Sequence, residues 1–189
     1  MATRKAHYLV ADLFINRWSA RAMSGASVSH DELMSLFEAA RWAPSSYNNQ
    51  PWRFVYVHRD TDQWQSFFEL LVDFNKQWCK NAAVLILIIS QDTFSYNGKP
   101  CRTHSFDTGA AWMSFALQGH LNGLVVHAME GFDYERARIA AAVPVGYTIE
   151  CMVAVGQPGA RESLPAELQS KEEQSDRKSV SEFVFEGHF

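Results

Sequence analysis

Two polar clusters near the N-terminus combine side chains suited to holding a polar ligand. The first is Arg17-Trp18-Ser19-Ala20-Arg21. In an extended backbone alternate side chains share a face, so Arg17, Ser19 and Arg21 would point the same way. Guanidinium groups form paired hydrogen bonds with phosphate oxygens, so this spacing indicates a phosphate site. A solvated surface patch is the alternative interpretation, because short arginine and serine clusters are common.

The second cluster is the loop from Pro44 to Trp52, which reads Pro-Ser-Ser-Tyr-Asn-Asn-Gln-Pro-Trp. Proline and asparagine are typical of turns, so a simple connection from a helix to a strand is one interpretation. However, Asn48 and Gln50 each carry hydrogen-bond donors and acceptors, which the pyrimidine edge of a flavin requires. The loop is therefore a candidate for contacting a planar polar ring.

A third segment, Glu130-Gly131-Phe132-Asp133, lies between a strand pattern and a helix pattern. Glycine lets the backbone approach a ligand closely, so the N–H of Gly131 could point at a ring nitrogen. Taken alone, the segment is better explained as a turn in which Asp133 caps the following helix.

Several other chemistries lack their sequence patterns. There is no Walker A motif, no Gly-x-Gly-x-x-Gly after a strand and no Gly-x-Ser-x-Gly. Cys101 and His104 could begin a metal site, but no second pair has ligand spacing, so we expect no metal. The formal net charge of −4 gives no reason to expect nucleic-acid binding.

Periodicity predicts the elements that would position these clusters. Helices are expected at 6–15, 62–80, 107–121 and 134–142. A further helix should begin at a capping box formed by Ser29 and Glu32 and run to Arg41. Strands are expected at 53–58, 84–89, 124–128 and 149–155, with a weak candidate at 183–185. Residues 156–177 are rich in Pro, Glu, Gln, Ser and Lys and should be exposed and loosely structured.

The chain has the composition of one globular domain. Its 189 residues are 47% apolar and 20% charged, and its three cysteines are widely spaced and odd in number. No apolar run of signal-peptide character follows residues 1–5, and the longest apolar run, 82–89, is too short to span a bilayer. We therefore expect a cytoplasmic protein with a single domain over 1–189, in which 157–189 form a C-terminal arm.

The order of these segments resembles the nitroreductase family over nearly the whole chain. It runs Arg-x-Ser-x-Arg, a capped helix, Ala-Pro-Ser-Ser-x-Asn-x-Gln-Pro-Trp-x-Phe, a buried strand, Glu-Gly-Phe-Asp, and Gly-Tyr before a strand that ends in Val-Gly-Gln-Pro. The resemblance implies an α+β fold with a mostly antiparallel central sheet flanked by helices. It also implies an intertwined homodimer in which the C-terminal segment extends over the partner.

The same resemblance implies an FMN site between the two subunits. Residues that match cofactor-binding positions are Arg17, Trp18, Ser19, Arg21, Pro44, Ser45, Ser46, Asn48, Gln50, Asn75, Glu130, Gly131, Arg177 and Lys178. The arginines and Ser19 would hold the phosphate and ribityl chain, and the loop at Pro44 would pack on the flavin of the partner. Asn75 would bond the pyrimidine edge, and the catalytic pair Glu130 and Gly131 would lie beside flavin N5.

Some positions depart from the family pattern. Trp78 stands where some relatives have Lys or Arg, and Ser175 and Ser179 replace a Lys and a Pro near the C-terminus. Lys178 is adjacent to Arg177 and is a candidate substitute for the missing lysine. Phe106 and Trp112, beside a polar segment, are candidates for lining the acceptor pocket.

The resemblance implies an FMN-dependent oxidoreductase that works by ping-pong hydride transfer. NADH or NADPH would first reduce the flavin. An electron-poor acceptor, such as a nitroaromatic or a quinone, would then take the electrons from it. Fold does not fix chemistry, so a reductive dehalogenase, an enal or semialdehyde reductase and a flavin destructase stay open. A flavin-binding protein without turnover is the remaining alternative. The sequence does not choose the nicotinamide or the acceptor.

Overall fold

The computed structural model describes residues 4–189, so residues 1–3 of the expected domain lie outside the described part. A four-stranded sheet has the order β1-β2-β4-β3, and every neighbouring pair is antiparallel. Its strands are β1 (Trp52–His58), β2 (Val84–Gln91), β3 (Val125–Met129) and β4 (Tyr147–Gly156). The predicted α+β class with an antiparallel central sheet is confirmed.

The two central strands form the most buried part of the sheet. Residues 84–90 of β2 are all buried, as expected for a strand covered on both faces. The pairing of β2 with β4 shifts between Ile88 and Ile89, which oppose Cys151 and Ile149. Glu150 is the extra residue of this bulge, a feature that redirects a side chain relative to a regular strand.

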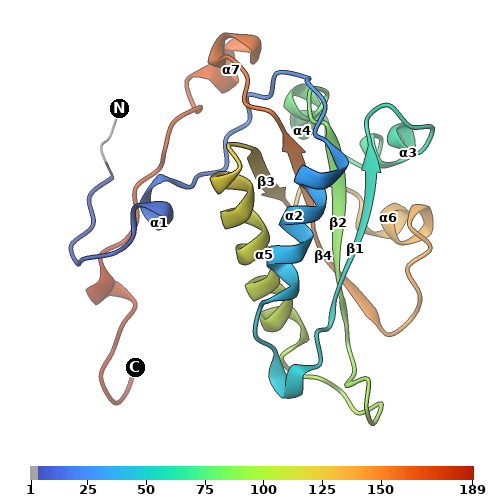
Figure 1. Cartoon of the computed structure of the whole chain (residues 1–189), viewed down its shortest axis with the longest axis vertical. Helices are drawn as coiled ribbons and strands as arrows, with labels where there is room; N and C mark the ends of the chain where they lie inside the picture. The colour runs from blue at the N-terminus through green and yellow to red at the C-terminus, as the bar shows by residue number, and fades with distance from the viewer. Residues whose placement is uncertain (1–3) are drawn as a thin grey trace.

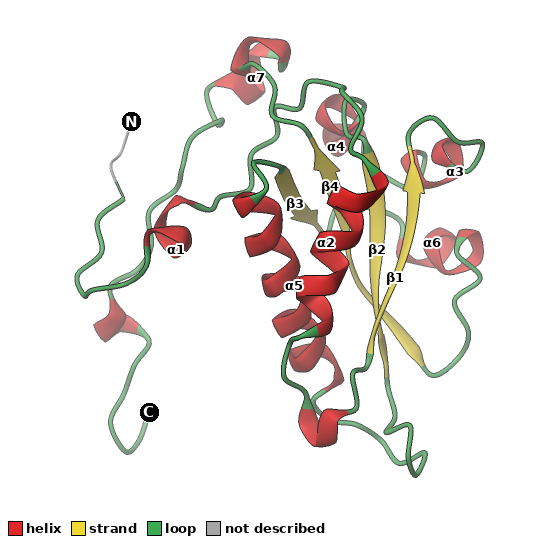
Figure 2. Cartoon of the chain, in the orientation of Figure 1, coloured by secondary structure: helices red, strands yellow, loops and turns green. Residues whose placement is uncertain are grey.

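Two long helices, α2 (His30–Arg41) and α5 (His104–Leu121), pack together on one face of the sheet (Figures 1 and 2). The predicted capping box of α2 is present, since the Ser29 hydroxyl accepts from the Glu32 N–H and Glu32 accepts from the Ser29 N–H. Leu33 and Leu36 of α2 are fully buried in the core that includes Phe115 of α5. The helix α5 begins three residues earlier than predicted.

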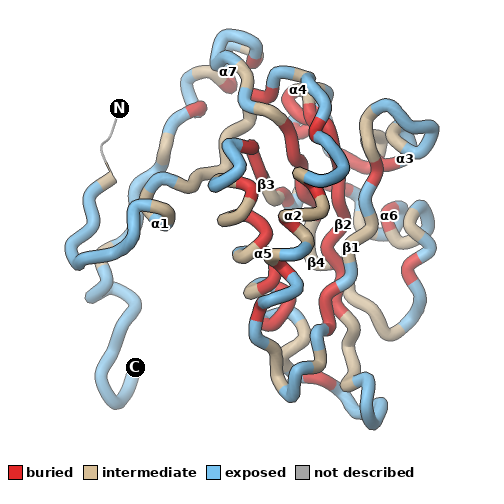
Figure 3. The backbone as a smooth tube through the Cα atoms, in the orientation of Figure 1, coloured by how far each residue is buried: buried red, intermediate tan, exposed pale blue. Residues whose placement is uncertain are grey.

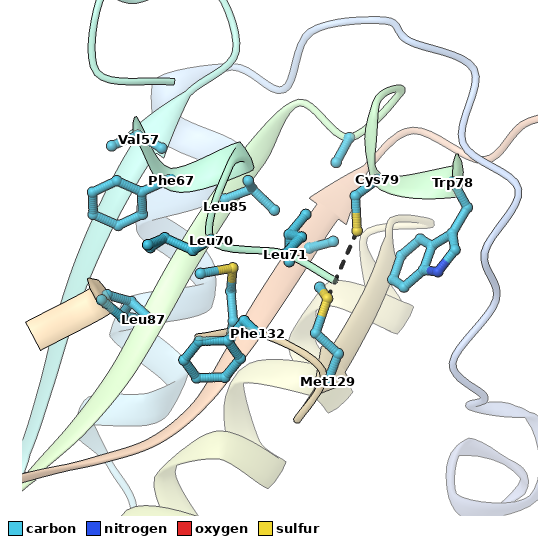
Figure 4. Close-up of a cluster of buried hydrophobic side chains, with 14 of the residues drawn as sticks. Val57, Phe67, Leu70, Leu71, Trp78, Cys79, Leu85, Leu87, Met129 and Phe132 are labelled. Atoms are coloured by element: carbon cyan, nitrogen blue, oxygen red, sulfur yellow. Dashed lines mark hydrogen bonds between the residues drawn. The ribbon is translucent and has the colours of Figure 1, made fainter. Parts of the chain in front are cut away.

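Three short helices cover the other face: α3 (Trp64–Phe68), α4 (Asp73–Cys79) and α6 (Tyr134–Ala140). Figure 4 shows the hydrophobic core between these helices and the sheet, to which Phe67, Leu70 and Trp78 contribute. The prediction of one helix over 62–80 is wrong. The chain breaks at 69–72 because Leu71 bridges Phe132 and the Val72 N–H donates to the Gly131 carbonyl at 3.1 Å.

The N-terminal and C-terminal segments run beside each other, away from the sheet (Figure 1), joined by bonds such as that from Arg4 to the Ser175 carbonyl. The N-terminal segment holds α1 (Asp12–Asn16), shorter than the predicted helix over 6–15. The C-terminal segment ends in the 3-10 turn η3 (Val180–Glu182), and the predicted strand at 183–185 is wrong. Residues 181–189 are all exposed, and no neighbouring strand among the described residues pairs with them (Figure 3).

The expectation that 156–177 is loosely structured holds only in part. The turn η2 (Arg161–Ser163) and the helix α7 (Ala166–Gln169) interrupt it. Leu164 and Leu168 are buried in the same hydrophobic core as Phe67 and Trp78. The chain therefore separates from the core of the domain only after α7. Within residues 4–189, no helix combines the length and apolar character needed to cross a membrane.

The close contact between α5 and the sheet gives the first testable prediction. A methyl group on Gly119 would lie 2.3 Å from Val126 Cγ2 and 3.3 Å from Leu36 Cδ2. We expect Gly119→Ala to lower the free energy of unfolding by about 1–3 kcal/mol, because a packed core tolerates extra atoms poorly. Chemical denaturation measures this change.

A matched control is available in the same helix. Gly109 of α5 has open space around the position of a Cβ. Gly109→Ala should raise the free energy of unfolding by about 0.5–1 kcal/mol, since alanine favours a helix over glycine. Equal effects of the two substitutions would contradict the packing argument.

Candidate functional site

A positively charged cavity of about 280 Å³ forms where the two terminal segments meet β3. Its lining residues are Arg4, Arg17, Trp18, Ser19, Arg21, His127, Lys171, Glu173, Ser175 and Arg177. The cavity thus unites the N-terminal cluster with Arg177, residues that are about 160 positions apart in the sequence. Lys178 is not among the lining residues, whereas Lys171 is.

The cations of this cavity repel one another. Burial, followed by the nearby charges of Arg4 and Arg177, lowers the pKa of Arg17 from its usual value. Burial and then Arg177 likewise lower the pKa of Arg4. The Arg17 guanidinium donates to the Ser19 hydroxyl at 3.4 Å, so these side chains do share one face. A bound anion would relieve the repulsion and accept hydrogen bonds from the same donors.

Two anchors hold the terminal segments around the cavity. Glu172 is buried, and its Oε1 accepts from the backbone N–H groups of Arg21 at 2.7 Å and Ala22 at 2.8 Å. Arg4 donates from Nη1 to the carbonyls of Ile15 and Arg17, and from Nε to the carbonyl of Ser175 at 2.8 Å. The cavity therefore depends on contacts that cross the whole length of the chain.

His127, on β3, forms the inner wall of the cavity. Its ring lies against Trp78 with centroids 4.6 Å apart, and its Nδ1–H donates to the Ala20 carbonyl at 2.9 Å. Burial lowers the pKa of His127 to about 4, so the imidazole is neutral at pH 7. Sequence reasoning missed it, because a single histidine in a strand pattern carries no signal of its own.

The Glu130–Gly131 turn is built tightly against α4. The Asn75 Nδ2 donates to the Gly131 carbonyl at 3.0 Å, and a Cβ on Gly131 would lie 2.6 Å from that nitrogen. Within residues 4–189, the Gly131 N–H makes no hydrogen bond, so it is an available donor. Glu130 is exposed. Asp133 caps α6 through the Arg136 N–H, as predicted.

Asn75 and Trp78 are both engaged inside the fold. The Trp78 Nε1 donates to the Asn75 Oδ1 at 3.3 Å, and the Trp78 side chain is only 1% exposed. Trp78 is therefore a core residue and supplies no ligand in place of a Lys or Arg. Asn75 keeps one N–H of its amide beyond the bond to Gly131.

The loop after α2 has an unusual backbone. It contains the 3-10 turn η1 (Ser46–Asn48), and Tyr47, Asn48 and Gln50 have φ values of 52°, 52° and 49°. The Gln50 side chain donates to the carbonyl and the side chain of Asn48, both at 3.1 Å. Gln50 thus braces the loop from within.

Further contacts fix this loop in place. The Gln50 N–H donates to the Ser45 hydroxyl at 3.0 Å. The Ser46 N–H donates to the buried carboxylate of Asp107 on α5 at 3.0 Å. Pro44 is exposed. No residue of this loop lines the cation cavity, so one chain does not bring the two predicted parts of the site together.

The two candidate acceptor-pocket residues lie in different environments. Phe106 is 81% exposed at the start of α5. Trp112 packs against the core between α2 and α5, where its ring stacks on Phe115 at 6.5 Å. No contact joins the two within the described residues.

A second polar cluster lies between the start of α5 and the central strands. The buried Ser90 hydroxyl contacts the His104 Nδ1 at 2.7 Å and donates to Glu150, the residue of the β-bulge. Ser105 also donates to Glu150, at 2.8 Å. Although His104 and Glu150 are potential ligands, no group of three or more metal-binding side chains converges within residues 4–189. This network attaches α5 to the sheet.

Another hollow is separate from these groups. It has a volume of about 500 Å³ and lies between α3 and α6, lined by Gln65, Ser66, Glu69, Leu70, Arg136, Ile139 and Ala140. No predicted site residue lines it. This hollow is larger than the cation cavity, but only the cation cavity gathers predicted site residues, so the cation cavity is the candidate site.

Comparisons with known proteins identify the family of the chain. The sequence matches the profile of the nitroreductase family over residues 15–77. A solved structure described as an oxidoreductase containing FMN shares 44% identity, with a TM-score of 0.95 over 98% of this chain and 96% of that chain. The chain therefore belongs to the nitroreductase family.

More distant structures share the fold. One is a Desulfovibrio desulfuricans protein solved in complex with FMN, at 21% identity and a TM-score of 0.74 over 94% of this chain and 96% of that chain. Another is a nitroreductase family protein from Streptococcus pneumoniae, at 18% identity and a TM-score of 0.75 over 93% and 98% of the two chains. A comparison with curated proteins finds no significant match.

The half-buried His127 predicts a pH-dependent stability. Its folded-state pKa of about 4 lies below the ordinary value of 6.5, so the unfolded chain binds a proton first as the pH falls. The free energy of unfolding should therefore decline between pH 6.5 and pH 4, by roughly 3 kcal/mol at most. Urea denaturation across this range measures the slope.

The variant His127→Phe should remove this contribution while keeping an aromatic ring against Trp78. A control variant, His188→Gln, changes an exposed histidine in the C-terminal segment and should keep the slope of the wild type. Identical slopes for the wild type and His127→Phe would show that His127 is not responsible.

Proposed function

We propose that this protein is an FMN-dependent oxidoreductase that uses NADH or NADPH to reduce an electron-poor acceptor, such as a nitroaromatic or a quinone. The observation that carries the proposal is the cavity in which Arg17, Arg21 and Arg177 converge. Membership of the nitroreductase family and 44% identity to an oxidoreductase containing FMN support it.

The residues fit the chemistry of FMN. Clustered guanidinium and ammonium groups, repelling one another, suit a phosphate dianion. A Cβ on Gly131 would lie 2.6 Å from Asn75 Nδ2, so glycine is what lets this turn pack against the Asn75 amide, a candidate partner of the pyrimidine edge. The unpaired N–H of Gly131 is a donor suited to a flavin ring nitrogen.

When bound, FMN would supply the redox chemistry by accepting two electrons and passing them to the acceptor. Arg17, Ser19, Arg21 and Arg177 would hold the phosphate and ribityl chain, with Lys171 in place of the predicted Lys178. The cationic wall would also favour a negative charge on a reduced cofactor. The neutral imidazole of His127 adds no charge to the cavity and keeps its floor packed against Trp78.

We also propose that the active unit is a homodimer. The loop at 44–50 lies outside the cation cavity of its own chain. The same loop of a second chain would therefore have to contact the flavin held by the first. The two terminal segments expose Leu9, Phe14, Phe183, Val184, Phe185 and Phe189, an apolar surface suited to covering a partner. A cytoplasmic location is supported by the free thiols of Cys79, Cys101 and Cys151.

The phosphate assignment is tested by Arg17→Ala. Removing one charged hydrogen-bonding partner should weaken FMN binding about 10- to 100-fold. Fluorescence titration of the apoprotein with FMN measures the dissociation constant. Arg136→Ala is the control, because Arg136 lies on α6 beside the separate hollow and should leave the constant unchanged. Unaltered FMN affinity in Arg17→Ala would remove this residue from the site.

The proposed activity is tested by anaerobic mixing of the FMN-loaded protein with NADH or NADPH. We expect the flavin absorbance band to bleach with at least one nicotinamide and to recover when a nitroaromatic or quinone is added. Stopped-flow absorbance measures both steps. Protein that binds FMN but is reduced by neither nicotinamide would be a flavin-binding protein, and protein that binds no FMN would refute the proposal.

A further inference from the structure

Three aromatic side chains from two loops gather beside the candidate flavin loop. The ring of Tyr47 lies 5.7 Å from that of Phe94, edge to face, and 6.1 Å from that of Tyr96. Phe94 and Tyr96, which follow β2, are 5.5 Å apart. Tyr47 is 81% exposed and Tyr96 is 63% exposed, so their faces are open to a ligand.

The backbone on both sides of this cluster is fixed. Asn49 donates from Nδ2 to the Thr93 carbonyl at 3.2 Å, and its Oδ1 accepts from the Ser95 N–H at 2.9 Å. A second tie is the bond from Ser46 to Asp107. These bonds join the loop at 44–50 to the loop at 92–101 and hold both in one arrangement.

The conformation of Tyr47 is held against its own preference. With φ 52° and ψ 26° it is left-handed, a region that disfavours bulky side chains. Such residues persist only where surrounding contacts impose them, and they gather at ligand sites. A large ring that is both strained and exposed has no role in the core. In this conformation the Tyr47 ring lies beside those of Phe94 and Tyr96.

We propose that Tyr47, Phe94 and Tyr96, together called the aromatic shelf, form a binding site for the planar ring of the electron acceptor. The inference rests on the proposed function and narrows its substrate class to acceptors with an aromatic or quinonoid ring. Tyrosine rings have electron-rich faces, and an acceptor ring that carries nitro or carbonyl groups is electron-poor, so the two faces attract each other. The shelf adjoins Ser45 and Ser46, which would contact the flavin.

The competing occupant of this surface is the partner subunit. Among the described residues, half of the other exposed large apolar side chains lie on the two terminal segments, whereas the shelf lies on two loops tied by Asn49. Two tyrosine hydroxyls at its surface also suit a ligand with polar substituents better than a dry contact between chains. We therefore assign the shelf to the acceptor.

The test uses the FMN-loaded full chain, reduced with dithionite and mixed anaerobically with an acceptor. The probes are para-nitrobenzoate, which is a planar ring, and ferricyanide, which has none. Tyr47→Leu and Tyr96→Leu keep apolar bulk but remove the ring face, and Tyr96→Phe keeps the face. Tyr56→Leu is the control, since Tyr56 is an exposed tyrosine on β1 outside the shelf.

We expect each leucine variant to raise the apparent dissociation constant for para-nitrobenzoate about two- to tenfold, the effect of one stacked ring. Reoxidation by ferricyanide, FMN affinity and the mass of the dimer should stay unchanged. Tyr56→Leu should behave as the wild type, and Tyr96→Phe, which keeps the ring face and loses only the hydroxyl, should lose less affinity than Tyr96→Leu.

Three results would overturn the inference. Leucine variants that bind para-nitrobenzoate as the wild type does would show that the shelf does not hold the acceptor. An equal loss with ferricyanide would place these rings at the flavin, and a change in dimer mass by light scattering would assign them to the partner subunit. Wild-type protein without FMN would instead refute the proposed function, and this inference with it.

Discussion

One buried carboxylate joins the two halves of the cation cavity. Glu172 accepts hydrogen bonds from two successive N–H groups, those of Arg21 and Ala22, and so fixes the C-terminal segment across the N-terminal cluster. Together with the bonds from Arg4 to Arg17 and Ser175, that contact brings Arg17 and Arg177 into one cavity. The carboxylate also lies 3.9 Å from the Arg21 guanidinium and offsets part of the positive charge that gathers around it.

The cavity illustrates how a binding site conflicts with stability. Burial, and then the charges of neighbouring arginines, lower the pKa of Arg4 and Arg17, so the charged cavity disfavours the folded state when no anion is present. The left-handed backbone at Tyr47 also lowers the stability of the folded state, and it lies in the other predicted part of the site, the loop at 44–50. Both costs lie where a ligand is proposed to bind, and the well-packed sheet between them has neither.

Local signals in the sequence predicted the parts of the structure that local interactions determine. The capping box at Ser29, the cap at Asp133 and the apolar run of β2 each depend on neighbouring residues, and each is present. The break at 69–72 could not be predicted, because the apolar periodicity continues through it and its cause is a contact with Phe132. The tail at 183–185 has strand-forming residues but no neighbour to pair with.

The candidate site, like the fold, could be predicted from the sequence only where neighbouring residues form a recognisable pattern. The Arg17 cluster and the loop at Pro44 carried their own patterns of residue types. Arg4, His127 and Lys171 did not, since each lines the cavity only through the fold. Lys178 was named for its position next to Arg177, whereas the chain direction after α7 brings Lys171 to the cavity. The role of each cofactor-binding residue stays a prediction.

The crossing of the two terminal segments has a consequence for the order of assembly. Met23 pairs with Pro158, and Gly159 passes so close that a Cβ there would lie 2.5 Å from the Met23 backbone. These contacts join parts of the chain separated by most of its length, and closing so long a loop is slow compared with forming local structure. During synthesis the sheet strands are complete before the C-terminal segment leaves the ribosome. A nascent chain that ends at β4 would therefore carry a nearly finished core but no site for an anion.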